Sequence, residues 1–154
     1  MTSPLYFYTK NVVFQEVPNE ISLAFSIAGC KNNCKNCSWK SFDISPKELT
    51  DDLYEELLEK YKGTVSCILF LGGEWNKDHL INNLKKAHQF GYKTCLYTGQ
   101  EDVTKDIKDN LDFIKVGPYI EEKGGLNNPN TNQRFFDLKT NQLLNKYFIH
   151  QEAF

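Results

Sequence analysis

Short hydrophobic runs alternate with amphipathic or polar segments along most of the chain, a pattern typical of strands joined by helices. Four such runs predict strands, at residues 21–28, 65–71, 92–97 and 113–116, and the first of them is nearly continuous in apolar residues, as a strand buried on both faces is. The segments between them predict helices at about residues 46–61, 78–90 and 101–110. Residues 5–17 predict one or two further short strands, and residues 135–138 and 143–149 predict a closing hairpin.

The first of these helices has a clear start signal in the sequence. Ser45 predicts the N-cap, Pro46 fits the first helical position, and Glu48 completes a capping box. The apolar stripe that follows consists of Leu49, Leu53, Leu57 and Tyr61. Gly63 predicts the end of the helix.

The order of strands and helices favours an α/β fold, in which parallel strands are joined by right-handed crossovers. The chain has 154 residues, which is the size of one domain, so we expect a single domain over residues 1–154. A complete eight-fold β/α barrel needs about 250 residues. The sequence therefore predicts a partial (β/α) barrel with mostly parallel strands.

Three of the five cysteines lie close together, in the spacing C-x3-C-x2-C, directly after the predicted strand 21–28. Cys30, Cys34 and Cys37 are near enough in sequence for their thiolates to meet at one metal centre, as in the short cysteine runs of iron–sulfur proteins. Three ligands would leave one iron of a four-iron cluster open to a further ligand. The spacing therefore favours a reactive iron–sulfur site on the loop after an early strand.

Two other interpretations of the three cysteines remain open. They could form part of a zinc site, completed by His79, His88, His150, Cys67 or Cys95, although the chain has no second C-x2-C or H-x3–5-H pair. They could also be structural or redox thiols, although a set of three is odd and no secretory signal precedes it. Cys67 and Cys95 lie inside apolar runs, which predicts buried thiols that act as small hydrophobic side chains.

Other polar and glycine-containing motifs also follow predicted strands. Gly72-Gly73-Glu74, Thr98-Gly99 and Gly117-Pro118 each come directly after one. In β/α folds the carboxyl ends of the strands carry the chemistry, so these motifs predict one shared face. The glycine pair would let a ligand approach the backbone, and Glu74 could bind an ammonium group. Ordinary turns are the alternative explanation of each motif.

The cysteine spacing and its place after an early strand resemble the signature of radical S-adenosylmethionine enzymes. More narrowly, the chain is similar to the activating proteins of anaerobic (class III) ribonucleotide reductases over about residues 11–138. The motifs that carry this resemblance are Cys30 to Trp39, Gly72-Gly73-Glu74, Leu96-Tyr97-Thr98-Gly99, Gly117-Pro118-Tyr119-Ile120-Glu121-Glu122 and Thr131-Asn132-Gln133-Arg134-Phe135. The family usually has proline after the Gly-Gly-Glu motif, where this chain has Trp75.

The resemblance implies two cofactors and a set of residues that hold them. Cys30, Cys34 and Cys37 would bind a [4Fe-4S] cluster, whose open iron would bind S-adenosyl-L-methionine. The residues implied for S-adenosylmethionine itself are Gly72, Gly73 and Glu74 at the amino group, Thr98 near the ribose or carboxylate, and backbone groups of Asn36, Cys37 and Ser38 at the adenine.

The resemblance also implies an activity. The reduced cluster would cleave S-adenosylmethionine to a 5′-deoxyadenosyl radical, which would install a glycyl radical near the C-terminus of an anaerobic ribonucleotide reductase. A low-potential donor such as a flavodoxin would supply the electron. The alternative from a different class is a non-catalytic iron–sulfur or zinc module for electron transfer or redox sensing.

Charge and composition exclude several other classes of function. The formal net charge is −2, which offers no basic field for nucleic acid. No run approaches the ~20 apolar residues of a membrane span. Unpaired cysteines without a secretory signal indicate a reducing environment, so we expect a cytoplasmic protein with no membrane or nucleic-acid partner.

Overall fold

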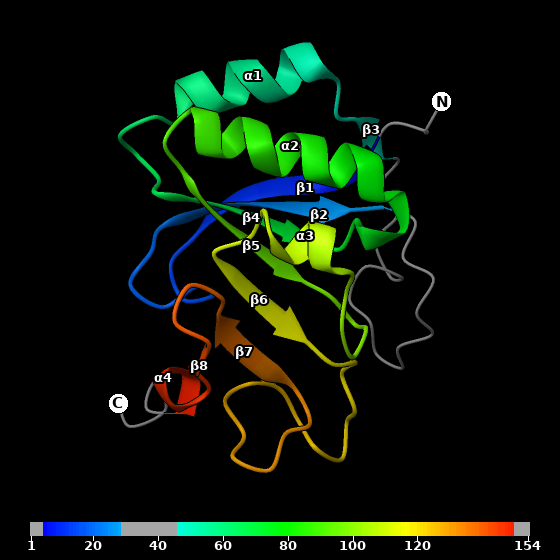
Figure 1. Cartoon of the computed structure of the whole chain (residues 1–154), viewed down its shortest axis with the longest axis vertical. Coiled ribbons are helices and arrows are strands. Elements are labelled where there is room, and N and C mark those ends of the chain that lie inside the picture. Colours follow the sequence, from blue (N-terminus) through cyan, green and yellow to red (C-terminus); the bar gives the residue numbers. More distant parts are fainter. Residues whose placement is uncertain (1–4, 29–45, 150–154) are drawn as a thin grey trace.

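The computed structural model describes residues 5–28 and 46–149, and these residues form one mixed β-sheet flanked by helices (Figure 1). The strands are β1 (Tyr6–Val13), β2 (Ser22–Ile27), β3 (Lys47–Glu48), β4 (Cys67–Leu71), β5 (Lys93–Tyr97), β6 (Phe113–Val116), β7 (Arg134–Asp137) and β8 (Gln142–Leu143). Their order across the sheet is β3-β1-β2-β4-β5-β6-β7-β8. The four central strands β2, β4, β5 and β6 are those that the hydrophobic runs predict.

The prediction of a partial (β/α) barrel with mostly parallel strands is wrong. Among the described residues, four of the seven strand pairings are antiparallel, and only β2–β4, β4–β5 and β5–β6 are parallel. The fold is therefore α+β, with a parallel centre and antiparallel strands on both sides.

Three of the antiparallel pairings join strands that are consecutive in the chain, and the connections between them contain no crossover helix. Residues 14–21 join β1 to β2 through a turn at Asn19, whose φ is 66°, and residues 138–141 join β7 to β8 through Asn141, whose φ is 59°. A parallel pairing needs a connection of about a dozen residues or more. The longer segment 117–133 between β6 and β7 forms turns and loops, and it also returns the chain in the opposite direction.

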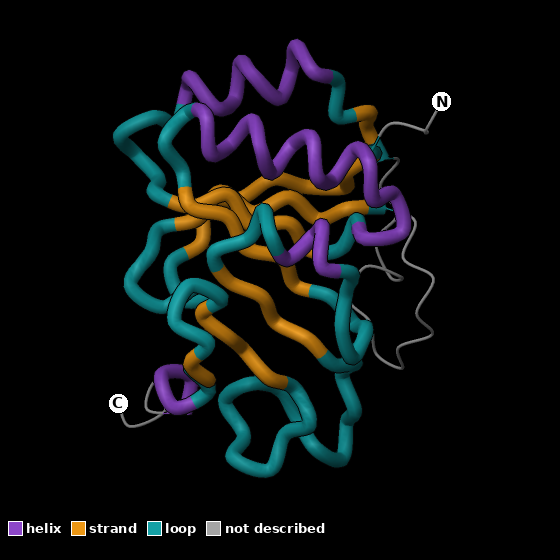
Figure 2. The backbone as a smooth tube through the Cα atoms, in the orientation of Figure 1, coloured by secondary structure: helices purple, strands orange, loops and turns teal. Residues whose placement is uncertain are grey.

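Two helices cover one face of the sheet and lie side by side above it (Figures 1 and 2). The helical elements are α1 (Asp51–Lys60), η2 (Glu74–Asn76), α2 (Lys77–Gln89), α3 (Lys105–Lys108) and α4 (Lys146–Ile149). Tyr54 and Leu57 of α1 pack with Leu80 and Leu84 of α2 against Phe25 and other residues of the strands. Among the described residues, no helix has the length and apolar character needed to cross a membrane.

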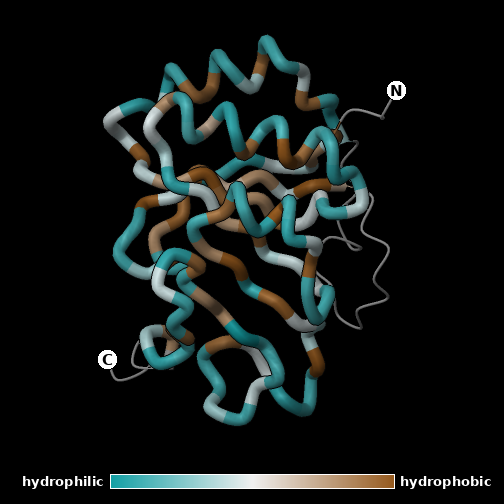
Figure 3. Tube along the Cα trace, in the orientation of Figure 1, coloured by the Kyte–Doolittle hydropathy of each residue, from teal (hydrophilic) through white to brown (hydrophobic). Residues whose placement is uncertain are grey.

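A second hydrophobic cluster lies on the opposite face of the sheet. It contains Cys67, Leu69, Cys95 and Phe135 from the strands and Val17 from the β1–β2 connection, all fully buried, together with Phe148 of α4 and others. The central strands β2, β4 and β6 are therefore buried on both faces, whereas much of β1 and all of β3 and β8 are exposed or half-buried. Figure 3 shows hydrophobic residues concentrated on the central strands, while α1 and α2 are largely hydrophilic.

The predicted start of the first helix is wrong. Lys47 and Glu48 form β3 instead, pairing antiparallel with β1. Helix α1 begins three residues later than Glu48, at Asp51, where the Thr50 hydroxyl accepts a hydrogen bond of 3.1 Å from the backbone N–H of Leu53. The backbone hydrogen bonds to β1 override the local capping signal, and Ser45 lies outside the described residues.

The closing hairpin and the third helix also differ from prediction. The second strand of the hairpin is only β8, and the chain then turns into α4. Leu144 and Phe148 are both buried, a spacing of four that suits a helical turn, and the Phe148 ring lies 5.1 Å from the ring of Phe135. Helix α3 spans only Lys105–Lys108 within the predicted segment 101–110.

The ring of Phe25 is the central contact of the helix-covered core, so we expect Phe25→Ala to be strongly destabilising. Its centroid lies 5.9 Å from Phe7, 6.0 Å from Tyr54 and 5.5 Å from Phe70. Truncation should lower the free energy of unfolding by about 3–5 kcal/mol in a urea titration. Phe14→Ala is the matched control, because Phe14 is 67% exposed and its loss should change stability by less than about 1 kcal/mol. Equal effects of the two substitutions would contradict this packing.

Candidate functional site

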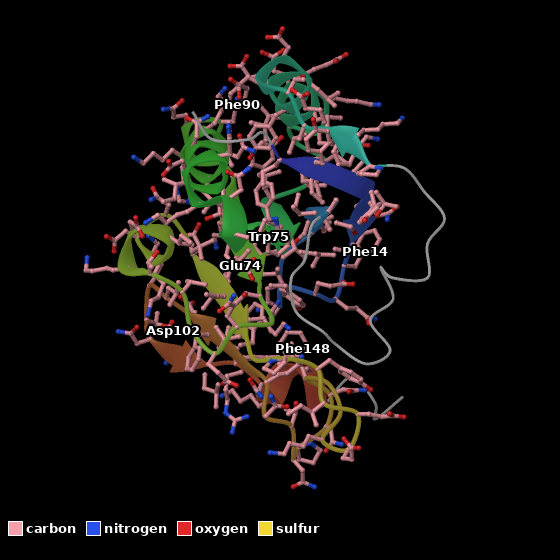
Figure 4. All side chains as sticks on the ribbon, turned by 90° about the vertical axis from the view of Figure 1, so that its right-hand side faces the viewer. Phe14, Glu74, Trp75, Phe90, Asp102 and Phe148 are labelled. Atoms are coloured by element: carbon pink, nitrogen blue, oxygen red, sulfur yellow. The ribbon has the colours of Figure 1, made fainter. Side chains whose placement is uncertain are left out.

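The candidate site lies at the carboxyl ends of the parallel strands, on the side that Figure 4 turns toward the viewer. Leu71 pairs with Tyr97, and Tyr97 pairs with Lys115, so β4, β5 and β6 end at similar levels. Backbone hydrogen bonds continue beyond the strands: the N–H of Gly72 donates to Tyr97 O at 2.9 Å, and the N–H of Thr98 donates to Lys115 O at 2.9 Å. The motifs that follow these strands are thus brought to one edge of the sheet.

Glu74 and Thr98, which are 24 residues apart in sequence, meet at this edge. The Thr98 hydroxyl donates a hydrogen bond to Glu74 Oε1, and it accepts one of 3.1 Å from the N–H of Gln100. Thr98 is almost fully buried. The second carboxylate oxygen, Glu74 Oε2, is also buried and has no hydrogen-bond partner among the described residues. A buried acceptor of this kind needs a donor, and an ammonium group of a ligand would be a suitable one.

Gly72 and Gly73 form a turn that residues with a side chain would strain. Their φ angles are 97° and 113°, and Gly73 precedes the short helix η2, which contains Glu74 and Trp75. The indole of Trp75 lies directly over Gly72, because a Cβ built there would be 2.6 Å from Trp75 Cη2. Trp75 therefore packs on the glycine turn. Figure 4 shows Glu74 and Trp75 near each other at this end of the sheet.

A pocket of about 320 Å³ adjoins Glu74. It is lined by Glu74, Lys77, Gln100, Asp102, Val103, Thr104 and Ile107. Two ion pairs lie at its wall, Lys77 with Asp106 at 3.0 Å and Lys108 with Asp102 at 2.9 Å. The hydrogen bond from Lys108 lowers the pKa of Asp102, and hydrogen bonds from Thr104 and then Lys77 lower the pKa of Asp106.

The other predicted site residues cannot be placed in this geometry. The cluster ligands Cys30, Cys34 and Cys37 and the predicted adenine contacts Asn36 and Ser38 lie outside the described residues. Within residues 5–28 and 46–149, no group of three or more His, Cys, Asp or Glu side chains could hold a metal ion.

The remaining cysteines and one of the histidines have structural surroundings. Burial raises the pKa of the Cys67 thiol to about 12 and raises that of Cys95 well above its ordinary value. His88 Nε2 lies 3.0 Å from Asp112 Oδ2 and 3.1 Å from the Thr94 hydroxyl, near the amino ends of β5 and β6. These residues are therefore poor candidates for completing a zinc site with the cysteine loop.

The motif Thr131 to Arg134 holds the turn after β6 in place. Gln133 Nε2 donates to Gly117 O at 3.3 Å, and Asn132 Nδ2 donates to Pro118 O at 3.0 Å. The guanidinium of Arg134 donates to the carbonyl of Thr131 at 2.6 Å. Two motifs of the family resemblance thus contact each other, and the contacts give both of them a structural role.

Sequence reasoning missed Lys115, which is buried in β6. It is 9% exposed, its Nζ lies 3.4 Å from Gly117 O, and the same ammonium lies 5.3 Å from the centroid of the Tyr97 ring. A signal was present, since Lys115 is the one charged residue in the predicted strand 113–116.

Comparisons with known proteins do not assign the chain to a family. No protein-family model, curated protein or solved structure matches the chain.

The contact between Gly72 and Trp75 predicts a steric cost that can be separated from backbone strain. Gly91 has a φ of 91°, close to the 97° of Gly72, but no described atom lies within 4 Å of a Cβ built there. Gly91→Ala should therefore lower the free energy of unfolding, measured by chemical denaturation, only by the strain of the left-handed backbone region, about 1–2 kcal/mol. Gly72→Ala should cost about 1–3 kcal/mol more, because the methyl group would collide with the indole. A Gly72→Ala loss no larger than that of Gly91→Ala would contradict the contact.

The raised pKa values of Cys67 and Cys95 predict that neither thiol reacts in the folded protein. With a pKa of about 12, the thiolate fraction of Cys67 at pH 8 is about one in ten thousand. Iodoacetamide at pH 8 should leave both cysteines unmodified in the native protein and alkylate both in guanidinium, as read by mass spectrometry of peptides. Because folding raises the pKa of Cys67, its burial stabilises the protein below the pKa of the unfolded thiol, and this contribution falls as the pH rises toward 12. Rapid alkylation of either thiol in the native protein would show that its strand is open to solvent.

Proposed function

We propose that the chain is a radical S-adenosylmethionine activating enzyme that installs a glycyl radical on an anaerobic ribonucleotide reductase in the cytoplasm. The cofactors are a [4Fe-4S] cluster on Cys30, Cys34 and Cys37 and S-adenosyl-L-methionine at the carboxyl ends of the parallel strands. The protein partners are the reductase and a low-potential electron donor such as a flavodoxin.

The contact between Glu74 and Thr98 is the observation that carries this proposal. The family resemblance assigns both residues to the same ligand, and their side chains are joined by a hydrogen bond in the fold. Glu74 Oε2 is left buried and without a donor among the described residues, which suits the ammonium group of S-adenosylmethionine. The cysteines support the proposal through the chemistry of their side chains, because three thiolates leave one iron open.

When bound, the cluster and S-adenosylmethionine would together supply a 5′-deoxyadenosyl radical, the species that would take a hydrogen atom from a glycine of the reductase. The role of the described residues of this chain is to bind S-adenosylmethionine and to orient it. Glu74 accepts a hydrogen bond from the ligand ammonium, Thr98 fixes the position of that carboxylate, and the glycine turn lets the ligand approach the backbone. The low exposure of Thr98 keeps water from competing for this contact.

The first test is cleavage of S-adenosylmethionine. Protein reconstituted anaerobically with iron and sulfide and reduced with dithionite should form 5′-deoxyadenosine. Cys34→Ala should lose the activity, because two thiolates cannot hold the cluster in the same way. Cys95→Ala is the matched control: it removes a buried thiol of the core and should keep the product.

Glu74→Gln should weaken binding of S-adenosylmethionine by roughly 10-fold or more, since a charge-assisted hydrogen bond is lost.

The result also decides between the two classes of function. An electron-transfer or sensing module would form its metal site but neither bind nor cleave S-adenosylmethionine, with no change in the EPR spectrum of the reduced cluster when it is added. An activating enzyme that needs its partner would cleave S-adenosylmethionine once the reductase is present. Failure to cleave in the presence of both cluster and reductase would overturn the proposal.

A further inference from the structure

Gln133 places a polar side chain in the interior of the fold, directly before β7. The residue is 5% exposed. Its Nε2 donates a hydrogen bond of 3.3 Å to the carbonyl of Gly117, and its own carbonyl accepts one of 2.9 Å from Asn145 Nδ2. Its backbone N–H donates to the Thr131 hydroxyl at 3.1 Å. Contacts on several sides therefore hold Gln133 in one position, with its amide group against the turn after β6.

The turn that Gln133 holds is bonded to the segment after β5. The φ angle of Gly117 is 103°, and a Cβ built there would lie 3.3 Å from both the carbonyl oxygen of Asn132 and Gln133 Cα. The N–H of Gly117 donates a hydrogen bond of 2.7 Å to the carbonyl of Gln100. Packing and hydrogen bonding at Gly117 therefore tie the backbone at Gln100 to the start of β7.

Gln100 is bonded in turn to the pair of side chains at the candidate site, and it also lines the pocket that adjoins Glu74. Its backbone N–H donates to the Thr98 hydroxyl oxygen at 3.1 Å. An ionised carboxylate can only accept hydrogen bonds, so the Thr98 hydroxyl proton is directed to Glu74 Oε1. Glu74 Oε2 then stays free of donors among the described residues.

A continuous series of four hydrogen bonds thus leads from Gln133 to Glu74, through Gly117, Gln100 and Thr98. In each of them the group nearer to Gln133 donates and the group nearer to Glu74 accepts. The series crosses the carboxyl ends of β6 and β5 and finishes at η2. Contiguous hydrogen bonds of this kind can carry energetic coupling between distant residues. A displacement of the Gln133 amide would therefore reach the Glu74 carboxylate.

We propose that Gln133 is a positioning residue that holds the Glu74 carboxylate in the orientation that binds the ligand ammonium. The inference rests on the proposed function, in which Glu74 binds the amino group of S-adenosylmethionine. It gives Gln133 a role that the family resemblance leaves open. Gln133 acts through the intervening hydrogen bonds and does not contact the ligand.

The test is a double-mutant cycle between Gln133 and Glu74. S-adenosyl-L-methionine is titrated calorimetrically into the anaerobically reconstituted wild type, Gln133→Met, Glu74→Gln and the double variant. Gln133→Met keeps an unbranched side chain of similar size but cannot donate to Gly117. It should weaken binding roughly 3- to 10-fold when Glu74 is present, and by less than about twofold in the Glu74→Gln background.

The cycle separates positioning from a general loss of structure. Loosening of the fold alone would weaken binding by the same factor in both backgrounds, because it does not depend on the carboxylate of Glu74. Asn145→Ala is the matched control: it removes side-chain hydrogen bonds to the same end of β7 without touching Gly117, and it should leave the affinity within about twofold of the wild type. Gln133→Leu also lacks the donor, so it should give the same two factors and replaces Gln133→Met if that variant does not fold.

The outcomes distinguish failure of the inference from failure of the proposed function. If the wild type binds S-adenosylmethionine and the loss in Gln133→Met is equal in the two backgrounds, or is matched by Asn145→Ala, the inference is overturned and the proposed function stands. If the wild type does not bind S-adenosylmethionine, the proposed function falls, and the inference falls with it.

Discussion

The parallel pairing of β4, β5 and β6 is the constraint on which the candidate site depends. Backbone hydrogen bonds fix the register of these strands, and the ladder continues past their ends through the N–H groups of Gly72 and Thr98. The main chain therefore places residues that are far apart in sequence at the same edge of the sheet. Side chains at this edge are close enough to contact each other, as Thr98 and Glu74 do. The precision of the site comes from the sheet.

The sequence predicts the centre of this fold well and its flanks poorly. Buried strands and α2 are evident because hydrophobic periodicity reports burial, and burial is what these elements share. Periodicity carries no information about strand direction, which depends on partners distant in sequence. The predicted hairpin supplies the antiparallel pairing of β7 with β8, but the antiparallel pairings of β1 with β2 and of β6 with β7 contradict the mostly parallel barrel. The same limit explains Glu48, whose local capping signal is weaker than its backbone pairing with β1.

Residues of the candidate site could be predicted where they belong to a motif directly after a strand. A polar residue inside a strand was not recognised from the sequence. Gly72, Gly73, Glu74 and Thr98 stand out in the sequence, and the fold brings Glu74 and Thr98 into contact. Lys115 was overlooked because a single charged residue does not disturb an apolar run enough to change its interpretation. Its burial depends on its position in β6 and on two neighbours, the Tyr97 ring and the Gly117 carbonyl.

The packing of Trp75 on Gly72 also constrains how this chain can change over evolutionary time. The indole fills the volume that any side chain at position 72 would need, so a larger residue at position 72 requires a change at position 75. A lineage that exchanged Gly72 first would pass through an intermediate with a steric collision, whereas loss of the indole first would open the space. The order of substitution is therefore directional.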